Sequence, residues 1–190
     1  MEKHKINIAI FASGTGSNAQ KIIDHFKINN DKAIVALIVT NNPDAGVLKI
    51  AEKENITSLV IEKKIFYDNG YLKEVKKHRI DFIVLAGFLL KIPSTLIQSY
   101  PNKIINIHPA LLPKYGGKGM YGVRVHESII NSKEKESGIT IHYVDEIYDH
   151  GQIIFQAICN VDENDSVATL AKKIHALEHE HYPKIIESIL

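Results

Sequence analysis

The chain has 190 residues and a formal net charge of +1, with 23 Lys and Arg against 22 Asp and Glu. This length predicts one globular domain over residues 1–190, large enough to fold without disulfide bonds. The balanced charge argues against nucleic acid as a partner, because nucleic-acid-binding domains usually carry a basic excess. Cys159 is the only cysteine, which excludes an intrachain disulfide. No apolar run is long enough for a membrane span or a signal peptide, so we expect a cytoplasmic protein.

Short apolar runs rich in β-branched residues predict five buried strands in the first part of the chain. They lie at residues 6–12, 33–40, 57–61, 81–86 and 104–107. Helices are expected between them, at residues 22–26 and their flanks, at residues 47–53 and 66–77, and near Pro93. Strands that alternate with helices form βαβ units with right-handed crossovers. The sequence therefore predicts a single-domain α/β fold with an open, twisted, mostly parallel, Rossmann-like sheet flanked by helices.

The last third of the chain predicts a different arrangement. A helix is expected from Gly122 to about Ser132, followed by strands at residues 138–144 and 152–159 that form a C-terminal β-hairpin. Residues 166–182 predict a long helix, because apolar side chains recur on one of its faces. Pro183 is expected to kink or restart that helix.

A glycine-rich loop, residues 13–18, follows the first predicted strand and precedes the first predicted helix. Gly14 and Gly16 allow a tight turn, and the helix N-terminus presents N–H groups and a favourable dipole to an anion. A phosphomonoester fits this loop best. A dinucleotide would need an acidic residue after the second strand, where the chain has Asn41 and Asn42. A glycine-rich turn that binds nothing is the alternative.

The fifth predicted strand ends in a polar pair. Asn106 and His108 alternate with Ile105 and Ile107, so both polar side chains leave one face of the sheet. They do so at its C-terminal edge, where open α/β sheets bind ligands. An amide and an imidazole held side by side can polarise a carbonyl group and move a proton. The alternative is a strand end at which both side chains bond the backbone of a turn.

Two acidic positions are further candidates. Residues 145–151 join the predicted hairpin strands, and an acid on this loop could reach His108; a solvated acidic turn is the alternative. Glu178 lies on the apolar stripe of the last helix, where it edges a pocket or marks the boundary of the buried face. Residues 175–179 match the H-x-x-E-H pattern of some zinc enzymes, but the segment that follows is short and mostly apolar. We therefore expect no metal site.

At these positions the chain resembles the phosphoribosylglycinamide formyltransferases, the folate-dependent purine-synthesis branch of the formyltransferase family. The matching motifs are SGTGSN (13–18), VLAGF (84–88), NIHPALLPKYGGKGMYG (106–122), HYVDEIYDHGQII (142–154) and EHEHYP (178–183). They extend over nearly the whole chain, and the long central motif is highly specific. The resemblance implies transfer of a formyl group from 10-formyltetrahydrofolate to the amine of glycinamide ribonucleotide in purine (IMP) biosynthesis.

The resemblance also implies a role for each candidate residue. The catalytic residues would be Asn106, His108 and Asp149, and Asp149 would raise the pKa of His108 and so keep it protonated. The substrate phosphate would bind Thr15, Gly16, Ser17 and Asn18, and the ribose would bind Glu178. The folate pocket would contain Leu89, Leu90, Lys91, Ile92, Asn106, Val144 and Asp145. The partners would be the two small-molecule substrates, with no metal, no nucleic acid and no membrane.

The chain departs from the family pattern near the folate pocket. Relatives often carry arginine just after the AGF motif, where this chain has Leu89 and Leu90 followed by Lys91. Some relatives bind the folate glutamate tail with an arginine, and the nearest cations here are Lys63 and Lys64. A lysine makes a point contact where an arginine makes a bidentate one. We therefore expect tail recognition to differ most from that of the relatives.

Competing functions remain open at this stage. A formyltetrahydrofolate deformylase, which gives the formyl group to water, would carry an additional N-terminal domain, and a methionyl-tRNA formyltransferase would carry a C-terminal RNA-binding domain; the sequence predicts neither. A non-catalytic phosphoribosyl-ligand sensor would not need Asn106, His108 and Asp149 together. By resemblance, the bond before Pro113 would be cis and the protein would be a monomer or a weak homodimer.

Overall fold

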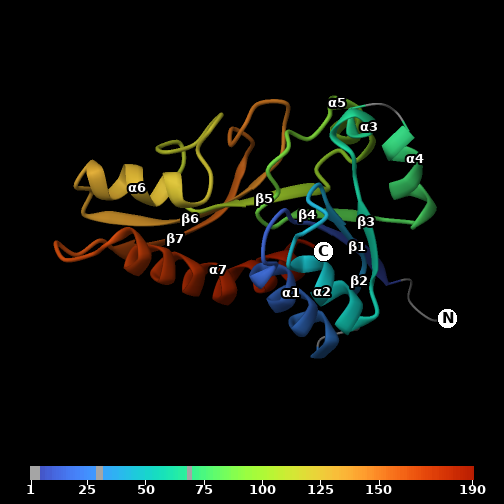
Figure 1. Cartoon of the computed structure of the whole chain (residues 1–190), viewed down its shortest axis with the longest axis horizontal. Coiled ribbons are helices and arrows are strands. Elements are labelled where there is room, and N and C mark those ends of the chain that lie inside the picture. Colours follow the sequence, from blue (N-terminus) through green and yellow to red (C-terminus); the bar gives the residue numbers. More distant parts are fainter. Residues whose placement is uncertain (1–4, 29–31, 68–69) are drawn as a thin grey trace.

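The computed structural model describes residues 5–28, 32–67 and 70–190. Its strands are β1 (Ile6–Phe11), β2 (Ala33–Thr40), β3 (Thr57–Val60), β4 (Phe82–Leu85), β5 (Ile104–His108), β6 (Glu136–Tyr143) and β7 (Ile153–Asn160). They form one sheet in the order β3-β2-β1-β4-β5-β6-β7 (Figure 1). Strands β1 to β5 run parallel, and β6 and β7 continue the sheet antiparallel. The predicted open, mostly parallel sheet with a C-terminal hairpin is confirmed.

Helices cover both faces of the sheet. They are α1 (Ser17–Ile28), α2 (Val47–Glu54), α3 (Lys63–Phe66), α4 (Gly70–Lys77), α5 (Ser94–Ser99), α6 (Val123–Asn131) and α7 (Val167–Ile189). On one face, Ile8 and Ile10 of β1 pack with side chains of α1, α2, α6 and α7. On the other face, Ala9 and Phe11 pack with side chains of α3, α4 and α5. Alternate strand residues point to opposite faces, so burial on both sides explains the continuous apolar runs of the sequence.

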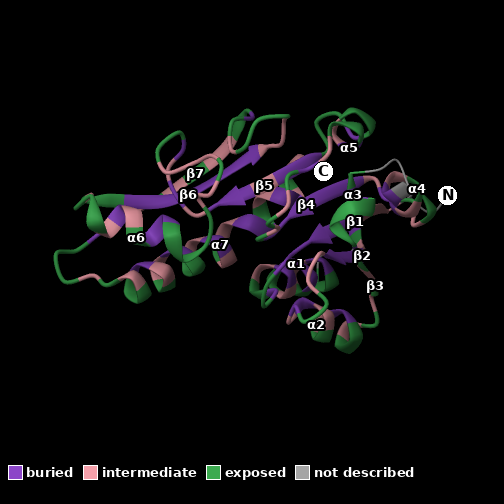
Figure 2. Ribbon diagram, turned by 45° about the horizontal axis from the view of Figure 1, so that its top comes forward, coloured by how far each residue is buried: buried purple, intermediate pink, exposed green. Residues whose placement is uncertain are grey.

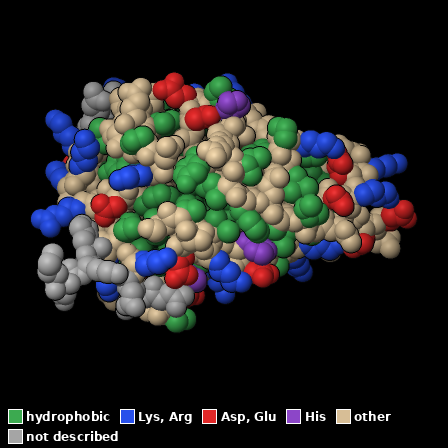
Figure 3. All heavy atoms as spheres, turned by 180° about the vertical axis from the view of Figure 1, so that it is seen from behind, with side chains coloured by type: hydrophobic (Ala, Val, Ile, Leu, Met, Phe, Trp, Pro, Cys, Tyr) green, Lys and Arg blue, Asp and Glu red, His purple; other side chains and the backbone are tan. Residues whose placement is uncertain are grey.

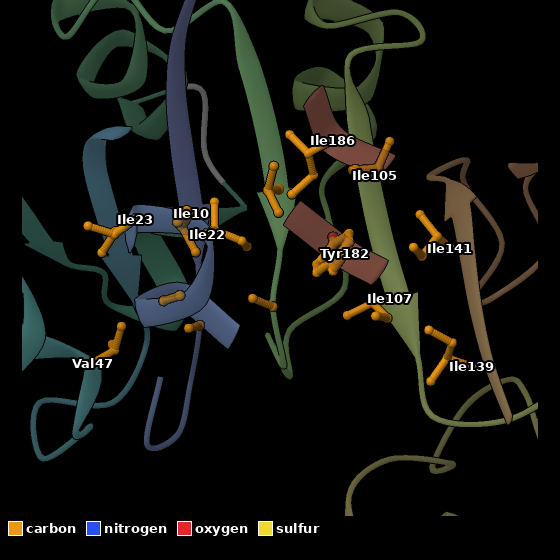
Figure 4. Packing of buried hydrophobic residues seen from close by; sticks show 14 of the residues in the cluster. Ile10, Ile22, Ile23, Val47, Ile105, Ile107, Ile139, Ile141, Tyr182 and Ile186 are labelled. Atoms are coloured by element: carbon orange, nitrogen blue, oxygen red, sulfur yellow. The ribbon is translucent and has the colours of Figure 1, made fainter. Parts of the chain in front are cut away.

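Helix α7 is anchored in the first of these two cores. Figure 4 shows Tyr182 and Ile186 of α7 between the isoleucines of β1 and α1 and those of β5 and β6. The buried Tyr182 hydroxyl donates a hydrogen bond to the carbonyl oxygen of Leu85 at 2.9 Å. Glu178 lies four residues before Tyr182 and therefore on the same face of the helix. Packing of α7 thus brings a buried carboxyl group to the sheet.

Two details of the predicted helices were wrong. The single helix expected over residues 66–77 is two helices, because α3 ends at Phe66 and α4 begins at Gly70; residues 68 and 69 lie outside the described residues. The rings of Phe66 and Tyr71 contact each other edge to face at 5.1 Å, so each helix is anchored by its own aromatic residue. Helix α7 does not end near Tyr182 and restart at Pro183 but continues to Ile189, while the kink at Pro183 stays a prediction. Buried side chains on both sides of the proline, Tyr182 and Ile186, hold the two segments on one core.

The surface has the distribution expected of a balanced composition. The central strands are buried, and exposed residues lie mostly on the outer sides of helices and in loops (Figure 2). Figure 3 shows one face on which hydrophobic side chains gather near the centre and charged side chains of both signs lie around them. Within the described ranges, no helix has the length and apolar character needed to cross a membrane.

Candidate active site

The loop between β1 and α1 has a backbone that depends on glycine. Gly16 has a φ of +83°, a conformation that residues with a Cβ rarely adopt. A Cβ at this position would lie 2.8 Å from side-chain atoms of Val47 and Ile50, so α2 packs directly against the loop. The first N–H groups of a helix have no partners within the helix and, with its dipole, favour an anion. The loop therefore has the form that the predicted phosphate site requires.

Ser13 joins this loop to the loop that follows β4. Its hydroxyl donates to Asn41 Oδ1 at 2.5 Å and accepts from the N–H of Leu89 at 3.0 Å. Its own N–H donates to the carbonyl oxygen of Gly87 at 3.0 Å. Strand β1 lies between β2 and β4, at the point where the strand order reverses and where open α/β sheets bind ligands. Asn41 follows β2, at the position where a dinucleotide-binding site would have an acidic residue. In this protein, its side chain accepts the hydrogen bond from Ser13 instead.

Strand β5 places His108 at the carboxyl edge of the sheet with a defined tautomer. The side chain is 3% exposed, and its Nε2 lies 2.7 Å from the carbonyl oxygen of Tyr115. A carbonyl oxygen can only accept, so Nε2 carries a hydrogen and donates. Any second proton on this ring must therefore sit on Nδ1, which lies 3.6 Å from Asp149 Oδ1.

Asp149 reaches this histidine from the loop between β6 and β7, as the sequence analysis anticipated. Its Oδ2 accepts from the N–H of Gly117 at 2.9 Å, and its Oδ1 lies 3.4 Å from Asn106 Nδ2. Its φ of +53° is unusual for a residue other than glycine, and such backbone strain collects at functional sites. Burial by itself raises the pKa of Asp149, but His142, His108 and the Gly117 N–H together bring the pKa below its ordinary value. Asp149 is therefore ionised at neutral pH.

His142 of β6 completes this group, and the sequence analysis assigned it no role. Its Nδ1 donates to the carbonyl oxygen of Tyr143 at 2.8 Å, which leaves Nε2 to accept from Asn106 Nδ2 at 3.1 Å. The same Nε2 lies 3.7 Å from Asp149 Oδ1. Residues 106 and 142 are direct partners in the antiparallel pairing of β5 and β6. The alternation of residues along β6 could have indicated which face of the sheet His142 lies on. Only the strand register shows that His142 lies opposite Asn106.

The turn after His108 is held by a buried threonine. Thr140 Oγ1 donates to the carbonyl oxygen of Ala110 at 2.7 Å and accepts from the N–H of Leu112 at 3.0 Å. It also accepts from Gln156 Nε2 at 2.8 Å, which uses the full capacity of a hydroxyl group. The bond between Leu112 and Pro113 is cis, as the resemblance implied. Thr140 therefore ties the segment that follows β5 to the hairpin by two hydrogen bonds.

Glu178 and Asn18 form a second polar group. Glu178 is 6% exposed, and its Oε2 accepts from Asn18 Nδ2 at 2.9 Å. Burial raises the pKa of Glu178, while the bond from Asn18 and the charge of His175 oppose that rise. Asn18 Oδ1 is buried and has no partner within the described parts of the chain. The glycine-rich loop is thus linked directly to α7 through Asn18 and Glu178. The unpaired Oδ1 of Asn18 can still accept a hydrogen bond from a ligand.

A cavity of about 590 Å³ connects these groups, a volume typical of small-molecule sites. It is lined by every residue to which the sequence analysis assigned a role: Thr15, Gly16, Ser17, Asn18, Leu89, Leu90, Lys91, Ile92, Asn106, His108, Val144, Asp145, Asp149 and Glu178. The structure therefore brings all of them together, while their separate roles stay predictions. Three histidines for which the sequence pattern predicted no role also line this cavity: His126, His142 and His175.

The expectation that Asp149 keeps His108 protonated is wrong for this structure. Burial is the largest influence and lowers the pKa of His108 from its ordinary value of 6.5. The charge of Asp149 and the bond to Tyr115 raise the pKa, as expected, but by less than burial and His142 lower it. His108 is therefore mostly neutral at neutral pH, with the lone pair of Nδ1 toward Asp149. In the described residues, no group of three or more His, Cys, Asp or Glu side chains could hold a metal ion.

Comparison with known sequences identifies the family. The model of the formyl transferase family matches residues 6–186. The chain is 39% identical over 187 residues to the phosphoribosylglycinamide formyltransferase of Bacillus subtilis (strain 168), covering 96% of this chain and 93% of that protein. It is also 39% identical over 194 residues to the chloroplastic phosphoribosylglycinamide formyltransferase of Arabidopsis thaliana. That alignment covers 99% of this chain and 66% of the plant protein, so the chain spans about two thirds of that relative.

Solved structures agree with the sequence comparison. The structure of glycinamide ribonucleotide transformylase 1 from Geobacillus kaustophilus superimposes with a TM-score of 0.90 at 36% identity, covering 98% of this chain and 100% of that chain. The phosphoribosylglycinamide formyltransferase of Bacillus halodurans gives a TM-score of 0.89 at 37% identity, covering 97% of this chain and 95% of that chain. The chain therefore belongs to the formyl transferase family and groups within it with the phosphoribosylglycinamide formyltransferases.

Proposed function

We propose that this protein transfers the formyl group of 10-formyltetrahydrofolate to the primary amine of glycinamide ribonucleotide in purine biosynthesis. The observation that carries the proposal is a single cavity that joins a phosphate-type loop to an amide, an imidazole and a carboxylate. The loop suits a phosphorylated acceptor, and the three polar groups suit acyl transfer. The names of the similar proteins support the same reaction.

The acceptor would occupy the part of the cavity formed by α1 and α7. The N–H groups of residues 15–18 would bind its phosphate at the N-terminus of α1. Glu178, buried beside Asn18, would accept hydrogen bonds from the ribose hydroxyls. Strand β4 separates β1 from β5, so the amine end of the acceptor would lie two strands along the sheet from β1, toward Asn106 and His108.

The folate would bind between the loop after β4 and the loop after β6. Leu89 is 50% exposed and Ile147 is 61% exposed, so both present apolar surface at the mouth of the cavity. Such a surface suits a flat ring system. Lys91 Nζ lies 5.9 Å from the centroid of the Tyr148 ring, which places a cation beside the same mouth. This lysine would make a point contact with an anionic tail.

The tautomer of His108 defines the path of the proton. The neutral amine attacks the formyl carbon and forms a tetrahedral intermediate with a negative oxygen and a positive nitrogen. Because Nε2 is bonded to the Tyr115 carbonyl, only Nδ1 can accept the proton that this nitrogen releases. The imidazolium that results is stabilised by Asp149 at 3.6 Å. The proton then passes to N10 of the folate as the bond from N10 to the formyl carbon breaks.

Asn106 is the donor placed for the oxyanion. One hydrogen of its Nδ2 bonds His142 Nε2 at 3.1 Å, and the other reaches Asp149 Oδ1 at 3.4 Å. The second bond is long and therefore weak, so this hydrogen is available to the negative oxygen of the intermediate. Loss of one such donor typically lowers the rate on the order of 10²- to 10³-fold.

We also propose that residues 1–190 act as one domain, as a monomer or weak homodimer in the cytoplasm. Packing of helices on the two faces of one sheet supports a single domain. The oligomeric state and the location stay predictions, which sedimentation and fractionation would check.

The first experiment measures release of tetrahydrofolate from 10-formyltetrahydrofolate with and without glycinamide ribonucleotide. Release that depends on the ribonucleotide is expected. Equal release without it would identify water as the acceptor and replace the proposal with a deformylase. The variant His108→Ala should lose most of the turnover, since general acid–base catalysis contributes roughly 10²- to 10⁴-fold. Ribonucleotide binding without turnover in the unaltered protein would indicate a ligand sensor.

A further inference from the structure

One buried imidazole of the cavity makes no hydrogen bond. His126 on α6 is 4% exposed, and its Nδ1 is fully buried without a partner in the described part of the chain. Its Nε2 also has no partner among the described residues, but this atom is not enclosed. Buried polar groups are nearly always paired, and one that is unpaired costs stability. Because no described residue bonds Nε2, this nitrogen has hydrogen-bonding capacity left for a ligand in the cavity that the ring lines.

The position of His126 relates it to two parts of the cavity. The ring lines the cavity that also contains Asn106, His108 and Glu178. Burial is the main cause of its lowered pKa, and the charges of His175 and His108 lower the pKa further. His126 is therefore neutral at pH 7 and lies within electrostatic reach of both the catalytic strand and α7.

The environment also indicates which nitrogen carries the hydrogen. A neutral imidazole has one N–H and one lone pair. A buried N–H without an acceptor is rarer in proteins than a buried acceptor without a donor. We therefore assign the lone pair to the enclosed Nδ1 and the hydrogen to Nε2, the nitrogen that is not enclosed on a ring that lines the cavity.

We propose that His126 binds the acceptor substrate by donating a hydrogen bond from Nε2 to an oxygen between its phosphate and its reacting amine. This inference rests on the proposed function and adds one residue to the acceptor site. The ligand group is a ribose or amide oxygen, because the phosphate is assigned to the N-terminus of α1. The folate is assigned to the loops after β4 and β6, so its affinity should not depend on His126. His126 is a binding residue, because the proton transfer belongs to His108.

A purely structural role would give a different signature. If His126 only filled space, an apolar residue of similar size would leave ligand binding unchanged. If the His126 side chain stabilised the packing of α6, its replacement by leucine would lower the stability of the protein. Replacement of an unpaired buried polar group by an apolar one is instead expected to leave stability equal or higher.

The test compares His126→Leu, His126→Gln and the unaltered protein. Calorimetric titration with glycinamide ribonucleotide alone gives the acceptor Kd, and steady-state assays give kcat and both KM values. His126→Leu should raise the acceptor Kd and KM by about 2- to 12-fold, the value of one neutral hydrogen bond. The folate KM and kcat should change by less than about twofold, and the Tm should not fall. The amide of His126→Gln should recover most of the affinity.

His78→Leu is the matched control, because His78 follows α4 and does not line the cavity.

Each result supports or overturns the inference. An unchanged acceptor Kd in a folded His126→Leu protein would overturn it, as would equal losses in the leucine and glutamine variants. A lower Tm with both KM values unchanged would assign a structural role. If the unaltered protein does not bind the ribonucleotide, the proposed function fails together with this inference. If the unaltered protein binds and formylates it but His126→Leu behaves identically, only this inference fails.

Discussion

At the scale of residues, two backbone carbonyls orient the catalytic group. The carbonyl of Tyr115 binds Nε2 of His108, and the carbonyl of Tyr143 binds Nδ1 of His142. The second nitrogen of each ring then faces the carboxylate of Asp149, at 3.6 Å and 3.7 Å. In the proposed mechanism, the proton path therefore depends on two carbonyl groups that do not themselves react. In that mechanism, Asp149 stabilises the positive charge that forms on His108 during the reaction, so His108 does not need to be charged beforehand.

The charge of Asp149 is predicted to control the pKa of His108. Because this charge raises the pKa against burial, Asp149→Asn should lower the pKa of His108 further below 6.5. Proton NMR titration of the imidazole, assigned with a His108→Ala protein, measures the change. Asp145→Asn is the matched control, since Asp145 pairs with His150 instead. A pKa of His108 that stays equal or rises in Asp149→Asn would contradict the assignment.

At the scale of elements, the glycine-rich loop depends on one conformation. Gly16→Ala should destabilise the protein by roughly 1–2 kcal/mol, because alanine is strained at a φ of +83° and its Cβ would meet Val47 and Ile50. The acceptor KM should rise in the same variant, since the loop is assigned to the phosphate. Gly14→Ala is the matched control for stability, because a Cβ there has nothing within 4 Å. Urea unfolding of both variants checks the prediction, and equal stabilities would contradict it.

Helix α7 begins at a capping box. The Ser166 side chain accepts from the N–H of Thr169, and the Thr169 side chain accepts from the N–H of Ser166. Ser166→Ala should lower the free energy of unfolding by about 1 kcal/mol, because one N–H at the start of the helix loses its partner. Ser128→Ala in α6 is the control, since Ser128 bonds only the carbonyl of Arg124 in its own helix. A larger loss in the control than in Ser166→Ala, measured by urea unfolding, would contradict the role of the cap.

At the scale of the whole molecule, the site is a product of the strand order. The glycine-rich loop follows β1, the loop proposed to face the folate follows β4, and Asn106 and His108 end β5, and these three strands are neighbours in the sheet. Asp149 and His142 come from the antiparallel hairpin, and Glu178 comes from α7. Segments far apart in the sequence therefore meet only at one edge of the folded sheet.

The buried histidines are predicted to make stability depend on pH. Burial lowers the pKa of His108, His126 and His179 in the folded protein, so the unfolded chain binds more protons as the pH falls below 6.5. Stability falls with falling pH wherever the unfolded state binds more protons. Glu178 opposes this trend, because its raised pKa favours protonation in the folded state.

Urea unfolding at about pH 7.5 and about pH 5.5 measures this dependence, and the free energy of unfolding should be lower at the acid value. The difference should be smaller in His126→Leu, which removes one of the three histidines. Equal or greater stability at the acid pH would show that these side chains titrate as they do in the unfolded chain.

The sequence alone predicted most of the elements, and every residue that it assigned to the site lines one cavity, but it assigned no role to His126 or His142. Apolar runs such as Ala33–Thr40 identify buried strands because burial on both faces leaves a continuous local pattern. Motifs such as residues 13–18 and 106–122 carry local chemistry that can be read without a fold. The break between α3 and α4 has a local signal that the predicted single helix ignored, because the turn-forming residues Asp68, Asn69 and Gly70 interrupt residues 66–77.

Only the tertiary structure determined the properties of the site that depend on contacts between distant segments of the chain. The strand register places His142 opposite Asn106, although 36 residues separate them. Packing of α6 encloses His126 in the cavity, and burial reverses the expected direction of the pKa of His108. Residue identity and local pattern determine which groups can react, because these are properties of short segments. Tautomer, charge state and access to the ligand arise from desolvation and from long-range contacts, which exist only once the chain has folded.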